Sequence, residues 1–178
     1  MKIKTHLGFT ILELLVVISI IGLLSSMVMA SARSARQKAS MARLAGDMHQ
    51  ISTQADIARD SANDTLIGIT GNGCSMCLFN TTQSVTSQTG AVAQNAAGWQ
   101  SLGFNAAPSD PWGNPYLLDE NEYEAGWAPC RHDMAISAGS NRIWAGFSTI
   151  DVSRPAGYLY QGPDDDLYFL LSYYSSCS

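Results

Sequence analysis

Nineteen consecutive residues without a charged side chain, from Leu14 to Ala32, constrain this chain more than any other feature of its sequence. As an α-helix, which rises about 1.5 Å per residue, the run is long enough to cross about 30 Å of bilayer hydrocarbon. We therefore predict a transmembrane helix within residues 9–32.

One carboxylate, Glu13, immediately precedes the uncharged run. An acidic side chain within a membrane helix is costly unless it reaches water or finds a partner. Near the helix end, Glu13 could reach the headgroups. The other interpretation requires a cation, and residues 9–32 contain none. A cut between Gly8 and Phe9 would create one, because Phe9 would then carry a new α-amino group.

The N-terminal residues resemble a known signature. A short leader with Lys2 and Lys4 ends in Gly8, and Phe9, a Thr-Ile-Leu-Glu-Leu-Leu run and the long apolar stretch follow. This order resembles the prepilin signature of type IV pilins and type II secretion pseudopilins. The resemblance implies a leader at residues 1–8, cleavage after Gly8 by a prepilin peptidase, and N-methylation of Phe9. It also implies that Glu13 guides the docking of subunits during assembly.

Two other targeting signals are possible for such an N-terminus. A secretory signal fits less well, because its apolar core is shorter and a small-residue cleavage site should follow it. An ordinary signal anchor remains an alternative, since hydropathy alone permits it.

The helix is predicted to continue beyond the membrane-type run. Apolar residues recur at steps of three and four, which places one apolar stripe on an amphipathic helix over residues 33–62; they are Met41, Leu44, Met48, Ile51, Ala55, Ala58 and Ala62. A free coiled coil is the alternative, but alanine and methionine are poor seam residues. We expect the stripe to pack under a globular head.

The head is predicted to occupy residues 63–178. Residues 67–107 are rich in Gly, Ser, Thr, Asn and Gln and predict a loop followed by a weak helix near residues 85–97. Short strand-like runs follow, separated by turn residues, at 116–118, 134–137, 143–147, 158–160 and 167–174. The expected fold class is therefore α+β, with a long N-terminal helix packed on a small antiparallel sheet, as in pilins.

A turn-rich segment opens the predicted sheet. Asp110 to Tyr116 reads Asp-Pro-Trp-Gly-Asn-Pro-Tyr, in which prolines and Gly-Asn specify turns and two aromatic residues offer surface to bury. The segment resembles the corner that opens the head sheet in the major pseudopilin of type II secretion. Similar heads occur in some other type IV filament subunits.

Charge is unevenly distributed along the chain. Four basic residues closely follow the apolar run, whereas only four basic residues accompany fourteen acids from Asp47 onward; the first four are Arg33, Arg36, Lys38 and Arg43. Binding to nucleic acid depends on neutralising phosphates, so the acidic distal part is unsuited to it. The basic cluster could contact anionic headgroups. It conflicts mildly with the N-terminus-inside orientation that the family resemblance implies.

The four cysteines, Cys74, Cys77, Cys130 and Cys177, all lie beyond the apolar run. Outside the cytoplasm an even count indicates disulfides, with three possible pairings. We favour Cys74 with Cys77 and Cys130 with Cys177; the second pair resembles the C-terminal disulfide loop of many type IV pilins. One alternative is a zinc site in which Cys74 and Cys77 act together with Cys130 and His132 as four ligands. A thioredoxin-like redox role for Cys74 and Cys77 is a weaker alternative.

A cluster of three acids, Asp164 to Asp166, offers hard oxygen ligands of the kind that Ca²⁺ prefers. In the pseudopilins that the chain resembles, calcium joins the loops that follow the turn-rich corner. That resemblance makes Asn141, Asp151, Asp164 and Asp165 the candidate ligands. The alternative is a solvated acidic turn.

The sequence gives no support for an enzyme. The sequence contains no Gly-x-Ser-x-Gly elbow, phosphate loop or His-Glu-x-x-His pair. His132 beside Asp133 could form a dyad, but no nucleophile follows at a persuasive spacing.

The sequence therefore predicts a structural subunit of a type IV pilus-like filament, most like the major pseudopilin of a type II secretion system. We expect a single-pass inner-membrane protein with its head in the periplasm or outside, which then polymerises through its N-terminal helix. Its expected partners are copies of itself, the prepilin peptidase, the inner-membrane assembly platform and minor pilins. A surface pilus subunit, favoured by four cysteines and a long head, is one alternative. A membrane-anchored binding module that never polymerises is another.

Overall fold

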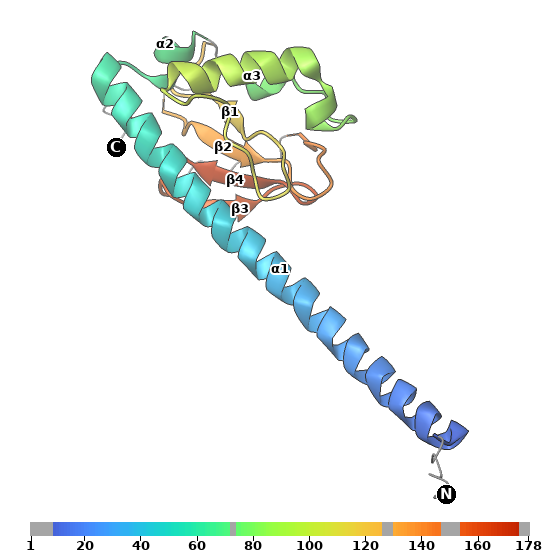
Figure 1. Cartoon of the computed structure of the whole chain (residues 1–178). Helices are drawn as coiled ribbons and strands as arrows, with labels where there is room; N and C mark the ends of the chain where they lie inside the picture. Colours follow the sequence, from blue (N-terminus) through green and yellow to red (C-terminus); the bar gives the residue numbers. More distant parts are fainter. Residues whose placement is uncertain (1–8, 72–73, 126–129, 147–153, 175–178) are drawn as a thin grey trace, which may run out of the picture. The chain divides into compact units, whose positions relative to one another are not determined.

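The computed structural model describes residues 9–71, 74–125, 130–146 and 154–174. Contacts divide the chain into two units, Met1–Ser40 and Met41–Ser178. We call the second the head unit, and each unit is described by itself. The helix α1, Ile11–Ala62, has residues in both (Figure 1).

Within the first unit, α1 is exposed as far as Ala39. Every described residue from Phe9 to Ala39 is exposed, including the apolar side chains of Ile11, Leu15 and Met29. By length and composition α1 could cross a membrane, as the uncharged run predicts.

Within the head unit, α1 buries one stripe of its surface. The buried residues recur at steps of three and four, and they are Leu44, Met48, Ile51, Ala55 and Arg59. The predicted stripe is correct from Leu44 to Ala55, whereas Met41 and Ala62 are exposed. The position one turn beyond Ala55 is occupied by an arginine.

Three short helical segments and a longer helix follow α1. They are α2 (Leu66–Thr70), the 3₁₀ turns η1 (Met76–Leu78) and η2 (Val85–Ser87), and α3 (Thr89–Ser101). The weak helix predicted at 85–97 is thus present as η2 and α3. In α3, Asn95 Nδ2 and Trp99 Nε1 both donate to the carbonyl of Tyr116, at 2.9 and 2.8 Å. Because these residues are one turn apart, α3 is fixed beside the turn-rich segment.

Four short strands form an antiparallel sheet in the order β1-β2-β4-β3. They are β1 (Leu117–Asp119), β2 (Met134–Ser137), β3 (Leu159–Gln161) and β4 (Leu167–Leu170). In register, Leu118 pairs with Ala135, and Ala135 with Phe169. The α+β fold class with a long helix and a small antiparallel sheet is therefore confirmed.

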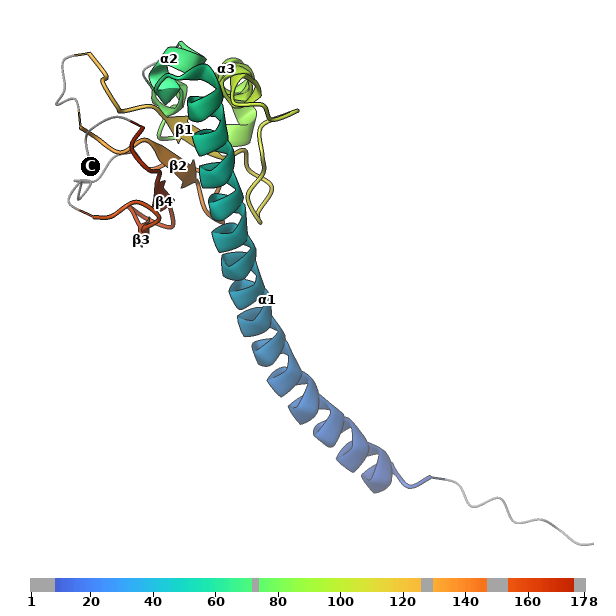
Figure 2. The ribbon, with the colours of Figure 1, turned by 90° about the vertical axis from the view of Figure 1, so that its left-hand side faces the viewer.

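Both faces of the sheet are buried. Leu118, Ala135 and Phe169 join the stripe of α1 and Trp99 of α3 in one cluster, and Figure 2 shows the head-unit part of α1 alongside the sheet. Alternate strand residues, such as Ile136 and Leu170, point into a second cluster. Its cover comes from η1, η2, the segment around Trp144 and the start of α3, where Ala91 and Val92 pack against it.

One predicted strand is wrong. Over residues 143–146 the chain forms no strand, and Ile143 makes only an isolated bridge to Ser84; Phe147 lies outside the described residues. Arg142 and Gly146 have φ values of 66° and 92°, which turn the backbone away from an extended path. The predicted strand 167–174 ends at Leu170.

Candidate functional site

The N-terminal residues of α1 form a reciprocal cap that the sequence analysis missed. Glu13 Oε2 accepts hydrogen bonds from the backbone N and the Oγ1 of Thr10, at 2.9 and 2.8 Å, and Glu13 N donates to Thr10 Oγ1 at 3.2 Å. This is a capping box, whose signature Thr-x-x-Glu is visible in the sequence. Glu13 therefore has a neutral partner, and its predicted attraction to the Phe9 amine, which exists only after cleavage, stays a prediction.

The turn-rich segment is organised by one buried carboxylate. Asp110, 1% exposed, accepts from the backbone N of Trp112 and Asn114 through Oδ1, at 3.0 and 2.8 Å. Its Oδ2 accepts from Ser137 Oγ at 2.7 Å. Gly113 takes a φ of 85°, which favours glycine. The corner is thus tied to the end of β2.

The same network continues to the acidic turn. Asn114 Nδ2 donates to the carbonyl of Gly139 at 2.8 Å. The following residues, Ser140 and Asn141, donate three hydrogen bonds to Asp165 Oδ2, from Ser140 N and Oγ at 2.7 Å and from Asn141 N at 3.0 Å. Any Cβ at Gly139 would meet Asp165 at 2.4 to 2.7 Å, so this approach requires glycine.

Of the four candidate calcium ligands, the structure brings three together. Asn141 Nδ2 donates to Asp164 Oδ2 at 2.5 Å, and Asp165 lies on the same turn; Asp151 lies outside the described residues. The donor set fits a cation in part. Asp165 Oδ1 is buried without a hydrogen-bond partner, whereas Asn141 Oδ1 already accepts from Ile143 N at 2.7 Å. No group of three acidic, histidine or cysteine side chains among the described residues has metal-binding geometry.

Asp166 of the acidic turn points inward. It is fully buried, and its Oδ2 accepts from Ala145 N at 2.8 Å while its Oδ1 has no hydrogen-bond partner. Burial raises the pKa of this carboxyl to about 7. Asp166 was not among the predicted ligands, and its position explains why residues 143–146 follow the turn rather than the sheet.

A second acidic group lies where β1 ends. Asp119, Glu120 and Glu122 are each at most 1% exposed. Burial raises the pKa of Asp119 and of Glu120 to about 7. Glu120 receives hydrogen bonds from Ser75 N and Oγ, at 2.8 and 2.7 Å, so it anchors the segment that carries Cys74 and Cys77.

The cysteines at 74 and 77 form a disulfide. A disulfide leaves neither sulfur as a thiolate ligand, which argues against the zinc alternative. Cys177 lies outside the described residues, so the pairing of Cys130 with Cys177 stays a prediction.

The side chains of His132 and Asp133 have separate partners rather than forming a dyad. His132 Nδ1 is 2.6 Å from the carbonyl of Leu171, and its ring stacks on Tyr173. Asp133 Oδ1 accepts from the backbone N of Asn121 and Glu122, at 2.6 and 2.9 Å. Its Oδ2 accepts from Arg59 Nη2 at 2.5 Å. Both residues therefore hold segments of the head together.

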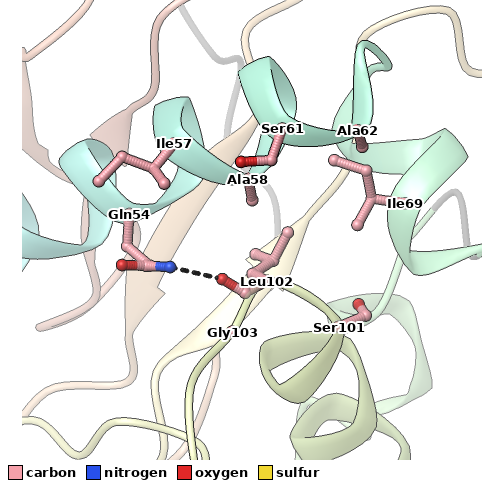
Figure 3. A pocket seen from close by; sticks show the side chains of 9 residues that line it. All are labelled: Gln54, Ile57, Ala58, Ser61, Ala62, Ile69, Ser101, Leu102 and Gly103. Atoms are coloured by element: carbon pink, nitrogen blue, oxygen red, sulfur yellow. Dashed lines mark hydrogen bonds between the residues drawn. The ribbon is translucent and has the colours of Figure 1, made fainter.

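A hollow of about 390 Å³ lies between α1, α2 and the end of α3 (Figure 3). It is bridged by a hydrogen bond of 2.9 Å from Gln54 Nε2 to the carbonyl of Leu102. None of its nine lining residues is charged; they are Gln54, Ile57, Ala58, Ser61, Ala62, Ile69, Ser101, Leu102 and Gly103. It therefore offers no group for catalysis by acid or base.

Comparison with known proteins identifies the N-terminal segment. A family model described as the prokaryotic N-terminal methylation motif matches residues 3–29. No curated protein and no solved structure matched the chain. The matched residues include Gly8, Phe9 and Glu13. The chain therefore carries the prepilin-type signature at its N-terminus, which fits a membrane-anchored single-pass protein and supports a type IV pilin-like or pseudopilin subunit.

Proposed function

We propose that this chain is a structural subunit of a type IV pilus-like filament, and specifically the major pseudopilin of a type II protein secretion system. The observation that carries the proposal is the methylation motif at residues 3–29. In this proposal a prepilin peptidase in the inner membrane cuts after Gly8 and methylates Phe9. The head then lies in the periplasm or outside the cell.

The exposed apolar surface of α1 supports polymerisation. A contiguous apolar surface of this length requires either lipid or protein partners. During assembly the helix would exchange lipid contacts for packing against identical helices. The inner-membrane platform and minor pilins would act at that step.

Glu13 would set the register of this packing. In the low dielectric of a helix bundle, a carboxylate is attracted strongly to a neighbouring ammonium group. The amine of a cleaved Phe9 on another subunit is such a group. Because Thr10 already satisfies one oxygen of Glu13, the second oxygen is available to this partner.

The head gives less direct support for a type II secretion pseudopilin over a surface pilus subunit. The corner from Asp110 to Tyr116 resembles that of the major pseudopilins, and its network reaches the acidic turn where we propose structural Ca²⁺. The partnerless, buried Asp165 Oδ1 supports that proposal. A surface pilus subunit, acting in adhesion, motility or DNA uptake, is the second candidate, and the four cysteines favour it.

Substitutions at residue 13 test the proposal and separate docking from capping. Glu13→Gln keeps an acceptor for the capping box but removes the charge, whereas Glu13→Ala removes both. We expect both variants to lower the yield of sheared filaments by about ten-fold or more, since both lose the ion pair. Thr10→Ala keeps the charge and is the matched control, with a yield close to that of the wild type.

The outcomes discriminate between functions. A wild-type yield from Glu13→Gln would show that the cap, not the charge, is what assembly needs. Normal yields from every variant would remove the docking role. A wild-type chain that stays in the membrane fraction and never enters filaments would favour a membrane-anchored binding module.

A further inference from the structure

A second hollow in the head unit is acidic and has aromatic walls. It measures about 340 Å³ and is lined by residues of α1 and of the segment after β4, namely Asp56, Arg59, Asp60, Ser172, Tyr173 and Tyr174. Asp56 and Asp60 lie one helical turn apart and like charges at this spacing repel. The lining thus carries two carboxylates and one guanidinium, that of Arg59, which leaves it net acidic.

The charges around this hollow do not balance. Arg59 contacts Asp133 at 2.5 Å and Asp56 at 3.2 Å, and Glu122 is connected to the lining through Tyr174 N at 3.0 Å. One guanidinium is therefore shared by the carboxylates of Asp56, which Ser172 also contacts, and Asp133, and Asp60 adds a third carboxylate to the same hollow. Asp60 is exposed and has no hydrogen bond or ion pair within the part of the chain that the structure describes.

The first unit carries cations that lack partners. Arg33, Arg36 and Lys38 are exposed on α1, and none of them makes a hydrogen bond or ion pair with a described residue. The basic residues of the head unit are engaged, for example Arg43 with Asp47 at 3.5 Å and Arg131 with Glu124 at 2.9 Å. Among the described residues, three basic side chains on α1 and the carboxylate of Asp60 therefore lack a partner of opposite charge.

We propose that the basic segment 33–38 of a second copy of this chain docks in the acidic hollow formed by Asp56, Asp60, Tyr173 and Tyr174. The proposal deepens the filament function and rests on it. An arginine or lysine entering the hollow would meet the carboxylate of Asp60, the Asp56 carboxylate that Arg59 already shares, and two aromatic rings, which attract cations. This would be the contact between subunits outside the apolar helix core.

The occupant comes from another copy rather than from the same chain. Lys38 and Asp56 are eighteen positions apart on one continuous helix, and side chains of a helix contact neighbours about one turn away. Each copy also carries one basic segment and one acidic hollow. A contact between two different surfaces is heterologous, and when repeated it generates an open filament unless the rotation between copies closes into a ring.

Cysteine crosslinking in assembled filaments tests this contact. Asp60→Cys is combined in turn with Arg33→Cys, Arg36→Cys and Lys38→Cys in the full chain, in cells that assemble it. Sheared filaments are oxidised and run without reductant. At least one pair is expected to give dimers and ladders about ten-fold above a control that combines the same basic-site cysteine with Gln94→Cys, which is exposed on α3.

The outcomes keep this contact separate from the filament proposal. Filaments that form but show no crosslink above the control in any pair would overturn the contact and leave the filament function standing. A wild-type chain that forms no filaments would overturn both. Crosslinks of equal strength in membranes without filaments would mean contact between unassembled copies, and would also overturn the proposal.

If Asp60→Cys blocks assembly, charge-reversal variants test the contact between the basic segment and the acidic hollow instead. Asp60→Lys and Arg36→Glu are each expected to lower filament yield about ten-fold, and the double variant is expected to recover to within about three-fold of the wild type. Asp64→Asn is the matched control, because Asp64 is exposed just beyond the end of α1 and does not line the hollow. A double variant no better than the worse single variant would overturn the proposal, and would leave anionic headgroups as the partner of the basic segment.

Discussion

Arg59 occupies a position where the stripe of α1 would place an aliphatic side chain. It is 1% exposed and pairs with Asp133, which is also 1% exposed. The Nε of Arg59 is buried without a hydrogen-bond partner, so the ion pair with Asp133 carries much of the compensation for burying this charge. The pair joins α1 to the residue just before β2.

Removal of Arg59 should strongly destabilise the head. Arg59→Ala leaves the Asp133 carboxylate buried and unpaired, which typically costs about 3 to 5 kcal/mol and should lower Tm by about 10 °C in detergent. Arg43→Ala is the matched control, because the Arg43 side chain is 56% exposed in its pair with Asp47, and such pairs contribute about 1 kcal/mol or less. Equal losses for the two variants would contradict this role.

The carboxylates at the end of β1 should make stability depend on pH. Burial raises the pKa of Asp119 to about 7, whereas the pKa of an unfolded aspartate is about 3.9. Between these values the folded state binds more protons than the unfolded state, so the free energy of unfolding falls as the pH rises. Tm should therefore decrease from pH 5 to pH 7 and level off above it.

Thermal melts of Asp119→Asn check this dependence. The variant should show a shallower decrease of Tm over the same pH range, while Asp60→Asn, an exposed carboxylate, should follow the wild type. Glu120 and Asp166, whose pKa values burial also raises to about 7, retain part of the slope. An unchanged slope in Asp119→Asn would show that this residue does not titrate in the range.

Sequence patterns predict the contacts of a side chain well where those contacts depend only on neighbouring residues in the chain. Thr10-x-x-Glu13, for example, is sufficient to predict a capping box. The burial of Arg59 could not be anticipated in this way, because its partner Asp133 is 74 positions away. The inward orientation of Asp166 likewise depends on Ala145 N, which only the folded loop brings near.

At the scale of elements, α1 and all four strands follow from periodicity and short apolar runs, with small shifts at their ends. The strand predicted at 143–147 is absent over residues 143–146, although Ile143 and Trp144 have strand-like composition. Trp144 is buried instead by packing in the second cluster. The part of that cover which η1 and η2 supply could not be predicted, since the 74–87 segment has no long periodic pattern.

The acidic turn allows a test of calcium at this scale. If Ca²⁺ binds the folded turn, excess metal should raise the Tm of the full chain in detergent, since a ligand at 100 times its Kd stabilises by about 2.7 kcal/mol. A chelator should reverse the shift, and Asp165→Asn should reduce it. Identical melting with calcium and with chelator would indicate a turn held by Ser140 and Asn141 alone.

At the scale of the whole molecule, two kinds of surface remain to be satisfied by partners. One is the apolar surface of α1 in the first unit, and the other is the pair of opposite charges formed by the basic residues at 33–38 and by Asp60. A lipid bilayer can satisfy the first. A polymer of identical chains can satisfy both, which is why we favour filament assembly over a solitary anchored protein.

The cleavage that creates the Phe9 amine is the step on which this account depends. Intact-mass and N-terminal peptide analysis of the chain purified from cells that assemble it tests the step directly. We expect a mature protein that begins at Phe9 and carries one methyl group on its α-amino nitrogen. A purified protein that still begins at Met1 would contradict the account.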